Sequence, residues 1–364
     1  MNENGYILII NPGSTSTKLA IYAYDLKLNE TQSYKERLVD HAGSDIPIMD
    51  QLNLRQQAVD AFLDEADVDL QIIMARGGPL RALEGGTYLV EAPMLDDLSS
   101  GRYATHASNL GALIGNRIGS KSGIAVYITD PVTTDEFEPL ARISGVPGIE
   151  RKSRSHALNM KASLRKLCQR LEKDVFKSSW VVCHMGGGIS VGALRDGKII
   201  DVNDALLGMG PFSPERAGAL PIAGILDLAF KPDSDRGSIE RLLSKRSGLM
   251  GYLGTSDLKA VEDRINGGDK EADLIFQALA YQIAKEISAM ASVLQFDIEG
   301  VLLTGGMAHS SLLCNAIINR INRISDVFIE SGENEIEALA QAGLRVLLGV
   351  ESIKTYAQRK ICSI

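Results

Sequence analysis

The strongest constraint on this chain is a strand–loop–strand pattern that occurs twice. The first copy spans residues 6–24 (YILIINPGSTSTKLAIYAY), where a loop of small hydroxyl side chains, a glycine and a lysine separates two apolar runs typical of strands. The second copy begins at residue 180 (WVVCHMGGGISVGAL) and has three glycines in its loop. Such loops leave backbone N–H groups open to an anion, and Lys18 adds a positive charge. One hydroxyl-rich loop alone is typical of an ordinary turn, but two related copies indicate two halves that bind phosphate.

The rest of the chain alternates between helical and strand-like segments. Helical periodicity occurs at residues 55–67, 106–118, 155–173, 271–296, 311–323 and 336–348. Short apolar runs typical of strands occur at residues 68–75, 87–90, 124–129, 301–304 and 327–330. A third glycine site, Gly305–Gly306, follows one of these runs, and the Gly- and Pro-rich segment 203–221 suits an ordered loop over a cleft. The sequence therefore predicts an α/β protein whose two halves close on one nucleotide.

Charge and cysteine content exclude several classes of protein. The net charge of −8 and the pI near 5.3 argue against a nucleic-acid-binding surface. We expect neither a secretory leader nor a membrane span, because no window approaches the roughly 18 apolar residues that a span needs. The cysteines, Cys168, Cys183, Cys314 and Cys362, lack metal-ligand spacing. We therefore expect a cytoplasmic protein with reduced thiols and neither zinc nor disulfides.

The phosphate loops match neither of two familiar nucleotide motifs. Lys18 lacks the preceding Gly and the following Ser or Thr of a Walker A loop. No GxGxxG follows the first strand, so a dinucleotide-binding fold has no support. What remains is phosphate binding by hairpin loops.

Charged side chains at strand ends and in loops supply what phosphoryl transfer needs, namely positioning, a carboxylate-held metal and neutralising cations. Asp130 ends a strand and can contact magnesium or its water shell, and Glu335 is a second carboxylate candidate. Arg76 and Arg216 carry guanidinium groups, which bind phosphoryl groups and carboxylates bidentately. His184 can contact phosphate or satisfy a backbone group. The structural alternatives are a turn-forming Asp, solvated arginines and a helix-capping Glu.

These motifs resemble the acetate/butyrate kinases of the sugar kinase–Hsp70–actin superfamily. The segments INPGSTSTKLAIY and VVCHMGGGISVGAL resemble the two phosphate loops of that family, and LLTGGMAHS resembles its adenosine-side glycine motif. The segments ARGGPLRALEGGTYLV, HASNLGALIGNRI and DALLGMGPFSPERAGALP are most similar to the butyrate kinase branch. The resemblance covers nearly the whole chain. It implies two duplicated actin-like (ribonuclease H-like) ATPase domains around a nucleotide cleft, one of residues 1–131 plus 337–364 and one of residues 132–336.

The resemblance also implies a role for each candidate residue. Near the transferred phosphoryl group it implies Asn11, Ser14, Ser16 and Lys18. At the β- and γ-phosphates it implies His184, Gly186, Gly187 and Gly188, and on the adenosine side Gly305 and Gly306. For the substrate carboxylate and the developing charge it implies Arg76 and Arg216, for magnesium Asp130 and Glu335, and for the substrate pocket His106 and Asn109.

The chain departs from acetate kinases at two points. Their HGTSH motif begins with a histidine that contacts the phosphoryl group, whereas alignment on Ser155–His156 places Lys152 there. Lys152, Arg154 and His156 are therefore alternatives for that role. Acetate kinases also have HGG where this chain has Arg76–Gly77–Gly78, so Arg76 is an approximate positional match.

The implied reaction is reversible phosphoryl transfer between ATP and a short-chain carboxylate, with butyrate as the expected acid and branched short acids as the alternative. The expected ligands are ATP or ADP, Mg²⁺ and the carboxylate, and the expected assembly is a homo-oligomer, at least a dimer. An actin- or Hsp70-like ATPase scaffold and a sensor of acyl phosphates are competing readings, because one fold can host unrelated functions.

Overall fold

The computed structural model describes residues 3–41 and 46–356. The chain divides into two compact units, one of Met1–Thr134 with Glu335–Ile364 and one of Asp135–Asn334. The domain limits expected from sequence, 131 and 336, lie three and two residues from these limits.

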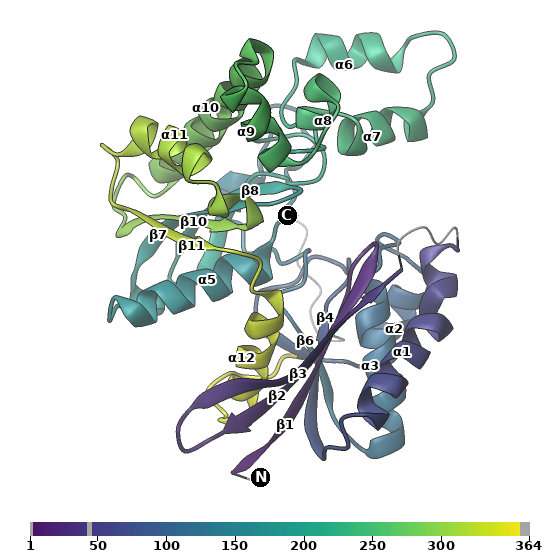
Figure 1. Cartoon of the computed structure of the whole chain (residues 1–364). Coiled ribbons are helices and arrows are strands. Elements are labelled where there is room, and N and C mark those ends of the chain that lie inside the picture. Colours follow the sequence, from purple (N-terminus) through teal and green to yellow (C-terminus); the bar gives the residue numbers. More distant parts are fainter. Residues whose placement is uncertain (1–2, 42–45, 357–364) are drawn as a thin grey trace. The chain divides into compact units, whose positions relative to one another are not determined.

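The first unit is built on a six-stranded sheet in the order β3-β2-β1-β4-β6-β5 (Figure 1). Its strands are β1 (Asn4–Pro12), β2 (Ser16–Asp25), β3 (Glu30–Asp40), β4 (Leu70–Arg76), β5 (Thr87–Leu89) and β6 (Val126–Thr129). Strands β1, β2 and β3 form an antiparallel meander, β4 and β6 continue it in parallel to β1, and β5 pairs antiparallel to β6. The predicted first hairpin is confirmed.

Helices cover both faces of this sheet. They are η1 (Ile48–Gln51), α1 (Leu52–Asp64), α2 (Ala92–Ser99), α3 (Asn109–Ser122) and α12 (Glu335–Leu347). Leu8 of β1 belongs to a core cluster that includes Phe62 of α1 and Leu110 of α3. The neighbouring Ile7 faces the other way, as side chains of a strand alternate. There α12 lies close because Gly343 has no side chain: a Cβ would come within 3.2 Å of Ile7.

The second unit repeats the arrangement with a five-stranded sheet in the order β11-β10-β7-β8-β9. Its strands are β7 (Ser179–Met185), β8 (Ile189–Arg195), β9 (Lys198–Val202), β10 (Gly300–Gly305) and β11 (Val327–Ser331). Again three antiparallel strands are followed by two parallel ones. The shared order confirms the predicted α/β fold with two duplicated halves.

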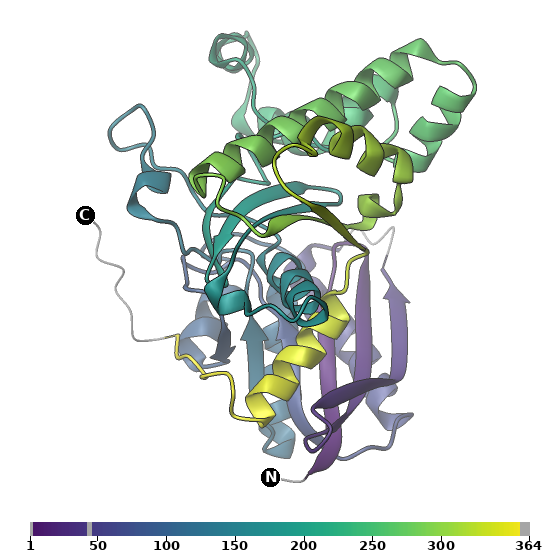
Figure 2. The same cartoon turned by 90° about the vertical axis from the view of Figure 1, so that its left-hand side faces the viewer.

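The helices of the second unit are α4 (Pro139–Arg142), α5 (Ala157–Arg170), η2 (Val175–Lys177), α6 (Ile222–Ala229), α7 (Arg236–Lys245), α8 (Gly248–Leu253), α9 (Leu258–Asn266), α10 (Lys270–Val293), η3 (Gly306–His309) and α11 (Ser311–Ile321). Leu164 of α5 packs in one core cluster with Val182 of β7. Val181 packs with α10 and α11 in another, so the sheet is covered on both faces (Figure 2). Alternation along β7 thus explains the three layers.

Two local expectations differ from the structure. The first loop is shorter than residues 11–18, because β1 and β2 pair up to Pro12 and Thr17 and leave Lys18 inside a strand opposite Asn11. The segment 222–266, for which no elements were predicted, forms α6, α7, α8 and α9. These helices have only six to ten residues each, fewer than the window over which hydrophobic periodicity is judged.

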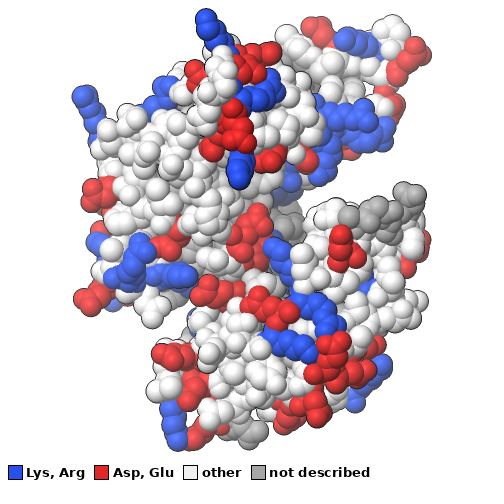
Figure 3. Space-filling view, in the orientation of Figure 1, with Lys and Arg blue, Asp and Glu red and all other residues white. Residues whose placement is uncertain are grey.

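Acidic and basic side chains are interspersed on the face of each unit shown in Figure 3. None of the helices within residues 3–41 and 46–356 has the length and apolar content that a bilayer crossing demands. The predicted free, buried thiols are confirmed for Cys168, Cys183 and Cys314, whereas Cys362 lies outside the described residues.

Candidate active site

The first unit gathers three predicted side chains at the carboxyl ends of its strands. Asn11 near the end of β1 donates from Nδ2 to Oε2 of Glu335 at 2.8 Å. Arg76 at the end of β4 pairs through Nη1 with Oε1 of the same carboxylate at 2.7 Å. Because β1 and β4 are parallel neighbours, their carboxyl ends meet, and Glu335 begins α12 at that edge. This partly buried ion pair restrains the Arg76 guanidinium.

Asp130 ends the adjacent parallel strand β6 in an unusual backbone conformation. Its φ is +39°, which non-glycine residues rarely adopt, and the residue is 2% exposed. Its Oδ1 accepts a hydrogen bond from the N–H of Gly86 at 2.8 Å, while its own N–H donates to the carbonyl of Gly86. Strained positions of this kind persist where the surroundings fix them, and they cluster at functional sites.

The β1–β2 loop presents its hydroxyl side chains to solvent. Ser14 is exposed, Ser16 is half-buried, and Lys18 is exposed on β2 next to the loop. The loop is closed by a hydrogen bond from the N–H of Gly13 to the carbonyl of Ser16 at 2.7 Å. This geometry agrees with an anion loop, with the lysine on a strand rather than in the loop itself.

The two residues expected at the substrate pocket differ in their exposure. His106 is exposed, and its Nδ1 accepts from the N–H of Ser108 at 3.2 Å, which leaves the proton on Nε2 in the neutral ring. Asn109 is 0% exposed and donates to the carbonyls of Leu98 and Ala104, each at 3.0 Å. A Cβ on Gly78 would lie 2.5 Å from Asn109 Oδ1. Asn109 therefore packs against the turn after Arg76, and its place in the substrate pocket stays a prediction.

In the second unit, a Cβ at three glycine positions would lie close to other atoms. A Cβ on Gly188 would lie 2.2 Å from Nη1 of Arg216, and one on Gly305 would lie 2.3 Å from the carbonyl of Met185. Gly305 also has a φ of +91°. A Cβ on Gly186 would lie 3.0 Å from Oε1 of Glu333, whereas Gly187 and Gly306 face open space. The turn Gly186–Gly188 thus brings backbone against the guanidinium of Arg216 and the carboxylate of Glu333.

A stacked pair of histidines lies beside this turn. The rings of His156 and His184 are 4.1 Å apart and nearly parallel. His184 Nδ1 is 2.6 Å from Nδ2 of the buried Asn159, and His156 Nδ1 is 2.8 Å from Oγ of Ser190. Each ring is therefore held by its own polar partner, on α5 and on β8 respectively.

The three alternatives for the phosphoryl-contacting role differ in their surroundings. Lys152 is exposed. Arg154 donates from Nε to Oδ2 of Asp204 at 2.9 Å and so anchors the loop that follows β9. His156 Cε1 would lie 3.2 Å from a Cβ on Gly188, beside the guanidinium of Arg216. Only His156 of the three lies against the glycine turn.

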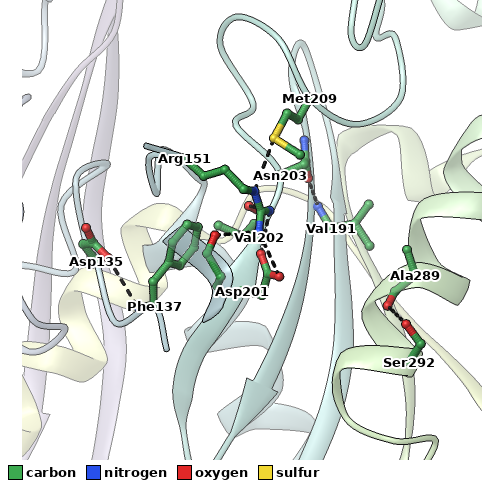
Figure 4. A network of polar contacts seen from close by, with 11 residues as sticks. Asp135, Phe137, Arg151, Val191, Asp201, Val202, Asn203, Met209, Ala289 and Ser292 are labelled. Atoms are coloured by element: carbon green, nitrogen blue, oxygen red, sulfur yellow. Dashed lines mark hydrogen bonds and ion pairs between the residues drawn. The ribbon is translucent and has the colours of Figure 1, made fainter. Parts of the chain in front are cut away.

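The loop that carries Arg216 is fastened to the sheet by polar contacts (Figure 4). Asn203 accepts from the N–H of Val191 at 2.6 Å and donates to the carbonyl of Ile189 at 2.9 Å. Arg151 pairs with Asp201 at 2.7 Å. Arg216 itself donates to the carbonyl of Ala205, and burial lowers the pKa of its guanidinium, which stays charged at neutral pH.

A pocket of about 620 Å³ opens beside the glycine turns of this unit. Its lining comprises Gly186, Gly187, Pro214, Glu215, Ser256, Asp257, Leu258, Lys259, Glu262, Gly306, Met307, His309, Ser310 and Glu333. The volume is in the range of small-molecule and cofactor sites. The sequence indicated the glycines of this lining but not Ser256–Glu262. The one sequence signal there is Asp257, which caps α9, and a capping Asp is common to many helices.

The described residues include carboxylates suited to a divalent cation but no preformed cluster of metal ligands. No cluster of three or more His, Cys, Asp or Glu side chains that could hold a metal is present in residues 3–41 and 46–356. Glu335 is bound by Arg76 and Asn11, and Asp130 by Gly86. This donor set fits Mg²⁺ that arrives with a nucleotide, because Mg²⁺ keeps phosphate and water ligands and takes one or two protein carboxylates.

Comparison with known proteins agrees with this arrangement. The profile of the Acetokinase family matches residues 149–351. A "probable butyrate kinase" of Listeria monocytogenes is 44% identical over 355 residues, which is 96% of this chain and 99% of that protein.

Solved structures show the same fold at low sequence identity. The acetate kinase of Porphyromonas gingivalis superposes with a TM-score of 0.76 at 16% identity, over 94% of this chain and 100% of that one. A propionate kinase of Francisella tularensis gives 0.74 at 17% identity, over 93% and 98%. The family profile and the 44% identical relative together decide the assignment: this chain is a member of the acetokinase family.

Proposed function

We propose that this protein transfers the γ-phosphoryl group of ATP reversibly to butyrate, giving ADP and butanoyl phosphate. Membership of the acetokinase family makes it a kinase that phosphorylates a carboxylate. The observation that carries butyrate as the acid is the 44% identity to a probable butyrate kinase over 96% of the chain. Butyrate and branched acids such as isobutyrate differ by little in shape, so branched acids are the alternative substrates.

The pocket of the second unit supports the nucleotide part of this proposal. His184 and the turn Gly186–Gly188 are proposed to meet the β- and γ-phosphates, with Gly305–Gly306 on the adenosine side. The pocket is lined by Gly186, Gly187 and Gly306, and its volume of about 620 Å³ suits a nucleotide. Lys259 supplies a cation in the same lining.

The cluster of the first unit supports the binding of the acid and the phosphoryl group. Arg76 is proposed to bind the substrate carboxylate and the developing charge, with Asn11, Ser14, Ser16 and Lys18 near the phosphoryl group. The same role is proposed for Arg216, which belongs to the second unit. A carboxylate is ionised at pH 7, so its oxygen attacks the γ-phosphorus directly and no general base is needed. As the new P–O bond forms, the bond to ADP breaks, and positioning and charge neutralisation provide the catalysis.

We further propose that Mg²⁺ accompanies ATP. Asp130 and Glu335 would hold it, directly or through water, and it would neutralise charge on the phosphates. We also propose a homo-oligomer, at least a dimer. The support for an oligomer is α6, in which no residue is buried and the apolar side chains of Ile222 and Leu226 are 78% and 51% exposed. Exposed apolar surface of this kind marks interaction sites.

The test is a hydroxamate-trapping assay with ATP, magnesium and a panel of carboxylates from acetate to valerate, including isobutyrate and isovalerate. Greatest turnover with butyrate is the expected result, and a maximum at a branched acid would replace butyrate by the alternative. ATP hydrolysis that does not depend on any carboxylate would favour a scaffold ATPase. Nucleotide binding without turnover would favour a sensor.

A further inference from the structure

A buried arginine lies beneath the β1–β2 loop and belongs to none of the motifs described above. Arg55 of α1 is 0% exposed. Its guanidinium donates from Nε and Nη2 to Oε1 of Gln51, at 3.0 and 2.8 Å. Gln51 in turn donates to the carbonyl of Ile46 at 2.7 Å. These contacts fix the plane of the guanidinium inside the protein.

The remaining donors of Arg55 bind the loop itself. Nη1 donates to the carbonyls of Gly13 and Ser16 at 2.9 and 3.2 Å and to Oγ1 of Thr17 at 3.0 Å. Nη2 lies 3.5 Å from the carbonyl of Ser14. The carbonyl of Thr15 accepts from the N–H of His41 at 2.6 Å. Every carbonyl of residues 13–16 is therefore bound by a donor of the protein.

The N–H groups of the loop tip are left available as a result. The N–H of Gly13 closes the turn. Those of Ser14 and Thr15 donate to no acceptor within residues 3–41 and 46–356, and both residues are exposed. Successive N–H groups without acceptors form a site for an anion.

The charge of Arg55 acts in the same direction. Its hydrogen-bond acceptors are neutral carbonyl, amide and hydroxyl oxygens, and no carboxylate of the described part of the chain forms an ion pair with it. Burial lowers its pKa, and no acidic group counteracts that effect. A buried charge without a counter-charge is costly, and an anion at the loop would supply that counter-charge.

We propose that Arg55 is a positioning residue for the phosphoryl group. It binds the loop carbonyls from below, so that the N–H groups of Ser14 and Thr15 face the incoming anion, and it makes the loop electropositive. The identity of the anion as the phosphoryl group of an acyl phosphate rests on the proposed function.

The test compares Arg55→Gln and Arg55→Lys with Arg117→Gln, a matched control on the exposed face of α3. Two quantities are measured: kcat and KM for butanoyl phosphate plus ADP, and the rise in Tm that inorganic phosphate produces. Arg55→Gln is expected to lower kcat about 10²-fold, as loss of an oxyanion-type site does, with KM for ADP within about threefold, and to abolish the phosphate-dependent rise in Tm. Arg55→Lys keeps the positive charge but lacks the forked donors of the guanidinium, so its kcat and its response to phosphate should lie between those of the wild type and Arg55→Gln. Arg117→Gln should match the wild type.

A folded Arg55→Gln variant with wild-type kcat and an unchanged response to phosphate would overturn the inference. If that variant does not fold, Gln51→Ala releases the guanidinium and keeps its charge; a loss of kcat in that variant supports the inference, and wild-type kcat with an unchanged phosphate response overturns it. The proposed function can fail while the inference holds. In that case the wild type would phosphorylate no carboxylate but would be stabilised by phosphate, and Arg55→Gln would lose that stabilisation. The anion-binding loop would then stand, and the proposed carboxylate substrate would be wrong.

Discussion

Individual residues of the candidate site are held in place by polar partners of their own. Arg76 is fixed by Glu335, His184 by Asn159 and His156 by Ser190. Side chains fixed before the ligand arrives lose little entropy when it binds, which is the structural basis of positioning. The residues around the glycine turns thus support function through geometry as well as charge.

Substitution of Arg216 by alanine should lower kcat at least ~10²-fold, because it removes a cation from the site where we propose that charge develops. The fold should persist, since Asn203 anchors the loop independently of Arg216. Steady-state kinetics of Arg216→Ala, with circular dichroism to verify folding, checks this outcome. Turnover close to that of the wild type would remove Arg216 from the mechanism.

Glu286 of α10 should make stability depend on pH. Burial, and then the charge of Asp201, raise the pKa of Glu286 above its ordinary value of 4.5, while Arg151 and Lys285 oppose the shift. A raised pKa means that the folded state favours the protonated form, so the contribution to stability is present below pH 4.5 and is lost as pH rises through the raised value. Glu286→Gln should therefore raise Tm at pH 8 but not at pH 4. Equal changes in Tm at both pH values would contradict the assignment.

Among the elements, the two hairpins and the glycine turn after β10 carry the site. The turn joining β7 to β8 brings backbone against Arg216 and Glu333, and the turn after β10 passes the carbonyl of Met185. At Gly305 the close atoms belong to backbone, so a Cβ there would force the chain to shift.

The neighbouring glycines Gly305 and Gly306 provide a matched test of whether a Cβ can be accommodated in this turn. A Cβ on Gly305 would lie 2.3 Å from the carbonyl of Met185, and its φ is +91°, whereas Gly306 faces open space. Gly305→Ala should reduce the free energy of unfolding by roughly 1–3 kcal/mol, while Gly306→Ala should change it by less than about 0.5 kcal/mol. Denaturant unfolding of both variants measures the difference, and equal effects would refute this steric account.

The sequence predicted the elements that are strongly patterned or adjacent along the chain. Both hairpins, the buried strands and helices such as α3 and α10 follow from local periodicity, and the charged strand ends pointed to Arg76 and Glu335. Arg55 and the lining of Ser256–Glu262 could not be predicted, because their importance comes from what lies against them in space. An arginine in a helix looks the same in the sequence whether its side chain is buried or exposed.

At the scale of the whole molecule, the chain repeats one sheet topology in two units. Three antiparallel strands followed by two parallel ones occur in both, and the inserted helices α6 to α9 belong to the second unit alone. Among these helices, α6 exposes Ile222 and Leu226, and Phe230 at its C-cap is exposed as well, so that an apolar side chain recurs every four residues in one stripe.

We expect this stripe to be covered by a second copy of the chain. In an antiparallel pair of α6 helices, Ile222 would oppose Phe230 and Leu226 would oppose itself, which suits a two-fold interface. Leu226→Glu should reduce the molecular mass measured by light scattering, whereas Leu274→Glu, on the exposed side of α10, should not. An unchanged mass in Leu226→Glu would exclude α6 from the interface.

The helix α12 has a consequence for how the protein is made. It belongs to the first unit although it follows the entire second unit in the chain. During synthesis, the sheet of β1 to β6 emerges with the Ile7 face bare and stays so until some 200 further residues, Asp135–Asn334, have left the ribosome. The second unit, being continuous, can complete its fold in the meantime. Helix α12 therefore both closes the first core and delivers Glu335 to Arg76, so that the carboxylate–guanidinium pair forms only after the second unit has been synthesised.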